Sequence, residues 1–391
     1  MSNGKGGFIG QDGLNAPDQA TGVAGTGGDT AVSVAFTAPS NVGAADITGF
    51  RVQSNDGIGA SGTSSPINVT GLTNGTSYTF NVWTINPFGY SSPSDASGSV
   101  TPLAAIALIA RGQHSSGQNN FDNQVDSLNI ATTGNSSDFG NLSVARISMN
   151  NCGSSSTRGI FAGGSKPSNV RSNVIDYFTI QSAGNATDFG NLAAANQNCT
   201  SVSSSTRSVT GGGRETDNVD RIQYVTIAST GNTTDFGNLL ETKSEFGSTS
   251  SPTRGLFFAQ GSGGSDDIEY ITIASTGNSQ DFGNMTVSCE SPACCASNTR
   301  GLHGGGSGDV ADIGYVTIAS AGNASDFGDL TVGRARIASA SSKVRGIFAG
   351  GYGNGIIDYI TISTTGNATD FGDMSAQSQL LSACSSAHGG L

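Results

Sequence analysis

The chain has 391 residues, of which 58 are glycine and 12% are charged, and 17 basic residues against 29 acidic ones give a formal net charge of −12. A surface of that sign repels phosphate backbones and anionic membranes, so we expect neither as a partner. Charge is sparse and short apolar runs are frequent, which is not the composition of a disordered chain. The composition is typical of a turn-dense, all-β protein exposed outside cells.

The length predicts about two domains. The longest apolar run, residues 103–110, is far shorter than the ~20 residues that a membrane helix needs, so we expect no membrane insertion. The first residues lack the apolar core of a signal peptide, and we expect synthesis in a cytoplasm, with exit by assembly or lysis. We divide the chain into a glycine-rich leader (1–16), a strand-rich domain (17–102) and a repeat array (103–391).

Residues 17–102 show seven short strand patterns separated by turn residues. Within them, residues 71–94 read GLTNGTSYTFNVWTINPFGYSSPS. Leu72 and Tyr78 of this stretch fit the tyrosine corner of an antiparallel sandwich. The segment resembles a fibronectin type III domain, and the resemblance implies a β-sandwich but no particular ligand.

The repeat array is marked by the tripeptide Asp-Phe-Gly, which recurs six times at intervals of 50, 47, 46, 45 and 44 residues. The copies begin at Asp138, Asp188, Asp235, Asp281, Asp326 and Asp370. A period near 45 residues is too long for one rung of a β-helix and matches one four-stranded propeller blade.

Each repeat has the same internal pattern. In the second, GIFAGG (159–164) predicts a strand that ends in a double glycine, and IDYFTI (175–180) predicts the next strand. GNATDFGNL (184–192) follows as a turn and a strand, and a further strand precedes the next repeat. Apolar residues on both faces of these strands predict sheets packed between two neighbours. No segment has helical periodicity, so we expect an all-β protein.

The array resembles kelch-type β-propellers through its double glycines (163–164, 211–212 and 350–351) and a tyrosine in the following strand. Where that family has a tryptophan, this chain has a phenylalanine in each Asp-Phe-Gly. The resemblance implies six blades of four antiparallel strands closed as a ring, with residues 103–109 beside 381–387. The tyrosines are Tyr177, Tyr224, Tyr270, Tyr315 and Tyr359.

The six aspartates have two catalytic interpretations that we set aside. Protein kinases use Asp-Phe-Gly to hold magnesium, but this chain has no glycine-rich phosphate loop or catalytic-loop motif. Sialidase propellers carry an aspartate box with a tryptophan, and the only tryptophan here, Trp83, lies outside the array. We interpret the aspartates as turn caps.

An arginine precedes the first strand of five repeats, and we place His388 at the sixth equivalent position. One interpretation is a basic ring that binds an anionic glycan or phosphate; the other pairs each arginine with a nearby carboxylate or carbonyl. Identical repetition favours the structural interpretation, because catalytic acid and base roles must differ. The arginines are Arg158, Arg207, Arg254, Arg300 and Arg345.

The remaining reactive side chains form no recognisable catalytic or metal-binding motif. The six cysteines, which include the adjacent Cys294 and Cys295, lack the spacing of a zinc site and are predicted to be reduced and buried, with a vicinal disulfide as the alternative. The three histidines have no metal-ligand neighbours at usable spacing. Because no nucleophile elbow, Walker loop or dinucleotide fingerprint occurs, we expect no enzymatic activity, cofactor or metal.

The domain order and repeat style resemble virion structural proteins of tailed phages, especially marine phages of cyanobacteria and similar hosts. The resemblance implies a protein in multiple copies on the tail, neck or capsid, released by lysis, whose propeller serves host adhesion, through a host surface glycan, or decoration. Other virion proteins would bind the leader, through Phe8, Ile9 and Leu14, and the sandwich domain. The alternatives are a bacterial surface or secreted glycan-binding module and, third, a propeller glycoside hydrolase or lyase.

Overall fold

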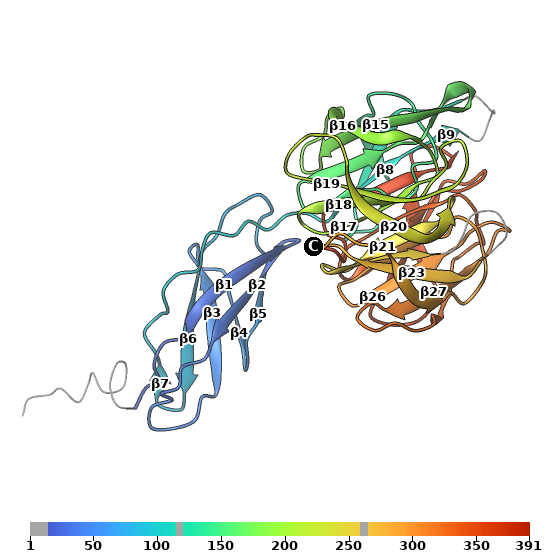
Figure 1. Ribbon diagram of the computed structural model, residues 1–391. Helices are drawn as coiled ribbons and strands as arrows, with labels where there is room; N and C mark the ends of the chain where they lie inside the picture. Colours follow the sequence, from blue (N-terminus) through green and yellow to red (C-terminus); the bar gives the residue numbers. More distant parts are fainter. Residues whose placement is uncertain (1–14, 115–119, 259–264) are drawn as a thin grey trace, which may run out of the picture. The chain divides into compact units, whose positions relative to one another are not determined.

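The computed structural model describes residues 15–114, 120–258 and 265–391. The chain divides into two compact units, Met1–Ala104 and Ala105–Leu391, which are described separately (Figure 1). Both units are built from β-strands, and a single 3-10 turn (η2, Pro167–Asn169) is the only helical element of the described residues. No helix in this described part is long and apolar enough to cross a membrane. The all-β prediction is confirmed.

The first unit is a sandwich of two antiparallel sheets. Alternate residues point into one shared core, in which Val34, Val52 and Val82 have no exposed surface. The hydroxyl of Tyr78 accepts a hydrogen bond from the backbone N–H of Thr73 at 3.0 Å, as the predicted tyrosine corner requires. One sheet has the order β1 (Thr21–Gly28), β2 (Ala31–Thr37), β5 (Ile67–Thr70); the other has the order β4 (Gly59–Gly62), β3 (Gly49–Ser54), β6 (Phe80–Asn86), β7 (Gly89–Tyr90).

A ladder of three serines replaces a regular strand along the edge of β6. Ser91, Ser94 and Ser97 are spaced three residues apart, and their backbone N–H groups donate to carbonyls of β6 at 2.9 Å. Their side-chain oxygens accept hydrogen bonds from the N–H groups of β6; Ser94 Oγ, for example, lies 2.9 Å from Val82 N. The edge of the sheet is therefore saturated without a strand that another chain could extend.

The second unit contains six antiparallel sheets of at least four strands. The third to sixth follow chain order: β17–β20 (Thr200–Ser203, Arg207–Gly211, Val219–Thr226, Thr234–Lys243), β21–β24 (Gly247–Ser250, Arg254–Phe258, Asp267–Thr272, Gln280–Asn284), β25–β28 (Ala293–Ala296, Arg300–Gly304, Asp312–Thr317, Ser325–Asp329) and β29–β32 (Ala338–Ser341, Arg345–Ala349, Ile356–Thr361, Thr369–Asp373). The second comprises β12 (Gly153–Ser154), β13 (Arg158–Ala162), β15 (Val170–Thr179) and β16 (Thr187–Asn196), with β14 (Ser165–Lys166) beside β15.

The first sheet joins both ends of the repeat array. Strands β8 (Ile106–Ala110), β10 (Gln124–Asn129) and β11 (Ser137–Asn141) come from its beginning, and β34 (Ser382–Ser385) from its end. Ser382 pairs with Ala110 and Ser385 with Ala107, so residues 103–109 and 381–387 are neighbours, as the sequence predicts. A short pair, β9 (Gln113–His114) and β33 (Ser378–Gln379), lies alongside. The first strand of each sheet contacts that of the next, and β34 contacts both β29 and β12.

The Asp-Phe-Gly and Gly-Asn motifs join neighbouring sheets through one repeated contact, here called the outer clamp. Gly184 N donates to Phe139 O at 2.8 Å, and Asn185 Oδ1 accepts from Asn141 N at 3.1 Å. A Cβ on Gly140 would lie 2.1 Å from Gly184 O, so the third motif position has room only for glycine. The asparagines of the other five clamps are Asn232, Asn278, Asn323, Asn367 and Asn135, and the clamp of Asn135 joins the first sheet to the sixth.

The phenylalanine of each motif, at the position where the kelch family has a tryptophan, is buried. Phe189, for example, packs edge-on against Tyr177 with ring centres 5.9 Å apart. The aspartates, predicted as turn caps, are in fact exposed residues near the start of the outer strands (β11, β16, β20, β24, β28 and β32), and none of the six carboxylates forms a hydrogen bond or ion pair with a described residue. The asparagine of the preceding turn accepts a hydrogen bond from the backbone of the neighbouring sheet instead.

Candidate functional site

The five recurring arginines occupy matching environments. The guanidinium carbon of Arg158 lies 4.7 Å from the ring centre of Tyr177, and its Nη1 donates to Ile227 O of the next sheet at 2.9 Å. The contacts recur for Arg207 (Tyr224, Ile273), Arg254 (Tyr270, Ile318), Arg300 (Tyr315, Ile362) and Arg345 (Tyr359, Ile130). A half-buried cation over an aromatic face favours a structural role. The anion-binding ring stays a prediction.

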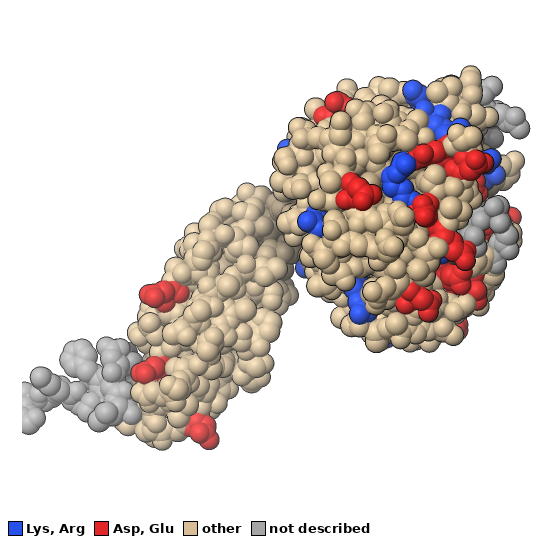
Figure 2. Space-filling view, viewed as in Figure 1, with Lys and Arg blue, Asp and Glu red and all other residues tan. Residues whose placement is uncertain are grey.

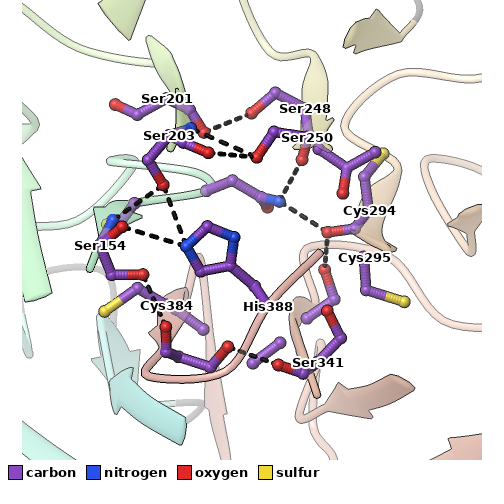
Figure 3. A pocket seen from close by; sticks show the side chains of 17 residues that line it. Ser154, Ser201, Ser203, Ser248, Ser250, Cys294, Cys295, Ser341, Cys384 and His388 are labelled. Atoms are coloured by element: carbon purple, nitrogen blue, oxygen red, sulfur yellow. Dashed lines mark hydrogen bonds between the residues drawn. The ribbon is translucent and has the colours of Figure 1, made fainter. Parts of the chain in front are cut away.

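The placement of His388 in this ring is wrong. In the first sheet the strand that corresponds to β13 is β8, and Ile106 stands where the other sheets have arginine. Ser127 stands where they have tyrosine, so both partners of the cation–aromatic pair are replaced together. His388 follows β34, and its ring turns toward the inner strands (Figure 3).

A buried polar side chain occupies one repeated position of each third strand, except in the fifth sheet. Asp176 lies 2.6 Å from the guanidinium of Arg146, and both side chains are fully buried. Burial lowers the pKa of Arg146, whereas the charge of Asp176 and its hydrogen bond raise it. Ser143 of the preceding sheet also donates to Asp176, at 2.7 Å. The equivalent ion pairs are Arg111–Asp126, Lys243–Glu269 and Arg334–Asp358, and Gln223 takes this position in the third sheet.

The fifth sheet has glycine at this position, and a histidine fills the space. A Cβ on Gly314 would lie 2.3 Å from Nε2 of His303, which is 2% exposed. The same Nε2 lies 3.3 Å from Thr286 Oγ1, which in turn donates to Asp312 at 2.6 Å. Burial lowers the pKa of His303 to about 4, so the ring is neutral near pH 7. The repeated second letter of IDY, IQY, IEY and IGY was the sequence signal for this position.

The inner strands end on serine in five sheets, and these serines surround a small polar pocket of about 40 Å³ (Figure 3). Most donate from Oγ to the carbonyl of the equivalent residue in the neighbouring sheet, at 2.5–2.8 Å. The pairs are Ser154 to Ser385, Ser385 to Ser341, Ser341 to Ala296 and Ser250 to Ser203. Small side chains suit the close approach of the inner strands, and their hydroxyls are committed to holding those strands together.

His388 completes this set of contacts between the second and third sheets. Its Nε2 lies 3.0 Å from Ser154 O and 3.3 Å from Ser203 Oγ, and its Nδ1 accepts from Gly390 N at 3.0 Å. This arrangement fits the neutral tautomer with hydrogen on Nε2. Burial lowers the pKa of His388 to about 4. Because Nε2 must donate to a carbonyl, the imidazole cannot take a proton from Ser203, and the pair is not arranged as a nucleophile and its base.

The other reactive groups near this pocket are also buried or engaged. Asn151 donates through Nδ2 to the carbonyls of Ser248 and Cys294, at 2.5 and 2.7 Å. All six cysteines are buried free thiols, and burial raises the pKa of Cys295 and of Cys384 to about 12. Within the described ranges, no group of three metal-ligating side chains comes together.

A larger hollow lies on what we call the double-glycine face. This face carries the loops between the second and third strands of each sheet, where the double glycines lie, and the loops that lead to the following sheet. The strands are antiparallel, so these loops emerge at the same end of the sheets. The hollow, here called the groove, has a volume of about 470 Å³ and is formed by three loops of the third and fourth sheets. Its lining is Arg214, Asp217, Asn218, Thr242, Ser244, Glu245 and Glu290.

The groove combines positive and negative side chains that are not paired with one another. Glu245 accepts a hydrogen bond from Asn198 at 2.9 Å, and Ser244 donates to Asn218 at 2.9 Å. Arg214, Asp217 and Glu290 form no side-chain hydrogen bond or ion pair with any described residue. Figure 2 shows both signs of charge close together on the visible surface of the second unit. These residues come from loops that carry no repeated motif, and sequence reasoning missed them.

Comparison with known proteins identifies the fold family of the first unit. The family model of the fibronectin type III domain matches residues 16–99, so the chain carries an N-terminal fibronectin type III domain. Among solved structures, titin domains A168–A170 are similar at 26% identity with a TM-score of 0.22, over 22% of this chain and 32% of that one. The chain thus spans about a third of that titin fragment. No curated protein matched it.

Proposed function

We propose that the chain is a non-enzymatic virion structural protein in which residues 105–391 form a closed six-bladed, kelch-like β-propeller that serves host-surface adhesion or decoration. Two observations support the closed ring. Strand β34, from the end of the array, completes the first sheet and contacts β29 of the sixth, and the outer clamp of Asn135 holds Asp373 N at 3.0 Å. A shared apolar cluster that includes Ile109, Ile347 and Phe371 fills the same boundary.

One observation favours a binding role over a catalytic role for the second unit. The polar groups of the inner pocket are engaged in contacts between sheets, whereas the unpaired charged side chains of the groove face solvent on the double-glycine face. Loops fixed on a rigid scaffold are a common place for binding sites. The second unit is therefore best suited to presenting a ligand-binding surface.

The virion setting rests on the resemblance of the domain order and repeats to phage structural proteins. In this setting the sandwich domain and the leader bind other virion proteins. The predicted anchor residues Phe8, Ile9 and Leu14 lie outside the described residues. The proposal needs no cofactor, nucleic acid or membrane insertion.

The closed ring is tested by removing one outer clamp at a time. Asn135→Ala removes the clamp between the first and sixth sheets, and Asn232→Ala removes the clamp between the second and third. In a closed ring both variants lose about 1 kcal/mol in the free energy of unfolding, because each loses one hydrogen bond at a sheet boundary. Urea unfolding measures this loss. If Asn135→Ala is neutral while Asn232→Ala is destabilising, the ring is open.

The virion role is tested with purified particles from a host that expresses the full chain. We expect mass spectrometry to find the protein in the particles and antibodies against residues 105–391 to label their surface. A variant without residues 1–13 should keep the fold of both units and fail to incorporate. Presence of the protein on the bacterial surface, and its absence from particles, would favour a bacterial glycan-binding module instead.

A further inference from the structure

The groove is set apart on the double-glycine face because several charged side chains share one hollow without forming an ion pair. Arg146 and Arg334 each form a buried ion pair, and Glu215, which follows Arg214 in the chain, forms a separate ion pair with Arg221 of β19. Those charges are satisfied within the protein. The groove instead keeps one guanidinium and three carboxylates in the same hollow without an ion pair between them.

The size and lining of the groove narrow the class of ligand. A volume of about 470 Å³ lies within the range of small-molecule sites, about 300–1,000 Å³. The lining contains no aromatic or aliphatic side chain, so recognition must depend on hydrogen bonds and charge. Three carboxylates against one guanidinium give a negative potential, which attracts a cationic group and repels an anionic one.

We propose that the groove binds a saccharide segment that carries free amino groups. Asp217 and Glu290 would hold the ammonium group, with the second oxygen of Glu245 available to a neighbouring hydroxyl. Arg214 and the amide of Asn218 would donate to ring and hydroxyl oxygens. This inference rests on the proposed adhesion function and names the ligand class for it.

Isothermal titration of the full chain at pH 6 with a glucosamine tetrasaccharide tests the proposal, with the N-acetylated tetrasaccharide as the uncharged probe. We expect saturable binding of one amino saccharide and at least tenfold weaker binding of the acetylated one. The double variant Asp217→Asn, Glu290→Gln should lose at least tenfold in affinity, because it removes both charges while keeping the shape of the side chains.

The matched control is Asp309→Asn, Asp329→Asn, which removes two exposed carboxylates outside the groove. It should bind the amino saccharide within twofold of the unmodified chain. If the two double variants lose the same affinity for the amino saccharide, the loss comes from the change in net charge alone and the groove is not the site. Equal affinity for both saccharides, tighter binding of a tetralysine peptide, or the absence of saturable binding would overturn the ligand class.

A separate measurement distinguishes this inference from the adhesion proposal. The full chain, labelled with a fluorophore, is incubated with host cells with and without an excess of the amino saccharide. If the chain binds cells equally well in excess saccharide, the adhesion function stands, but the groove is not the site of adhesion. If the groove binds the saccharide but the chain does not bind cells, the binding site stands and the adhesion function is wrong.

Discussion

The two units reach stability in different ways. In the described part of the first unit, Arg51 is the only lysine or arginine, no ion pair occurs, and one apolar core joins two sheets. The second unit has several apolar clusters between successive sheets, and buried ion pairs lie at four boundaries between sheets. The sandwich thus depends on one cooperative core, whereas the repeat array depends on many similar boundaries. Trp83, the only tryptophan, lies in the first unit, so its fluorescence reports that unit alone.

The largest expected effect is the loss of one buried carboxylate in the second unit. Asp176→Ala leaves the fully buried guanidinium of Arg146 without its counter-ion, and we expect a cost of about 3–5 kcal/mol. Replacing both residues by apolar ones, Asp176→Leu with Arg146→Met, should cost less than the single change. Urea unfolding followed by circular dichroism measures the loss, and Trp83 fluorescence should show an unchanged first unit. If Asp176→Ala alone is less destabilising than the double replacement, the interpretation that it leaves a buried unpaired charge is wrong.

The next largest expected effect is a difference between the two units in how their stability depends on pH. His303 has a pKa of about 4 in the folded protein and about 6.5 when unfolded, so between these values the unfolded chain binds the proton that the folded chain excludes. Protonation of His303 has no effect on the stability of the second unit above pH 6.5. It lowers the free energy of unfolding of that unit by up to about 3 kcal/mol as the pH falls to 4. His303→Gln should reduce the slope of stability against pH in this window. All three histidines lie in the second unit, so the unfolding of the first, followed by Trp83, should lack a histidine-dependent slope.

Two glycines with positive φ provide a third comparison. Gly190 has φ +149°, and a Cβ there would lie 2.3 Å from Gly231 O of the next sheet. Gly71 of the first unit has φ +79° and no atom within 4 Å of its Cβ position. Gly190→Ala should therefore cost about 3 kcal/mol and Gly71→Ala about 1 kcal/mol, because only the first adds a clash between sheets to the backbone strain. Thermal unfolding checks both, and equal shifts would show that the outer clamp tolerates a side chain.

The smallest expected effect concerns the serine ladder of the sandwich. Ser94→Ala leaves the buried N–H of Val82 without its partner, at an expected cost of about 1–2 kcal/mol. Ser99→Ala, an exposed change nearby, is the control and should be neutral. Trp83 fluorescence in urea measures both. A neutral Ser94→Ala would mean that water replaces the hydroxyl at this edge.

Much of the fold was predictable because it is periodic. Six copies of Asp-Phe-Gly predicted six repeated sheets, and the stretch around Leu72 and Tyr78 predicted the sandwich. The aspartates were misplaced because a strand residue next to a turn has the same local sequence as a turn cap. His388 was misplaced because the last repeat is divided between the two ends of the array, so counting residues along it no longer identifies equivalent positions.

The candidate site was not predictable in the same way. Arg214 and Glu290 are 76 residues apart, in loops of different sheets with no shared pattern, and only the stacking of those sheets brings them into one groove. The serine ladder was not predicted from the sequence for a related reason. Its period of three residues matches neither the alternation of a strand nor the period of a helix.

The shared first sheet has a consequence for biosynthesis. Strands β8, β10 and β11 leave the ribosome early, but the strand that completes their sheet, β34, is residues 382–385. At about 5–20 residues per second, roughly 15–60 seconds separate the two ends. During that interval β8 has an unpaired edge, and the buried faces of the first and sixth sheets have not met. Until β34 has been synthesised, we therefore expect the open edge of β8 to be a site of misassembly with another chain made on the same messenger RNA.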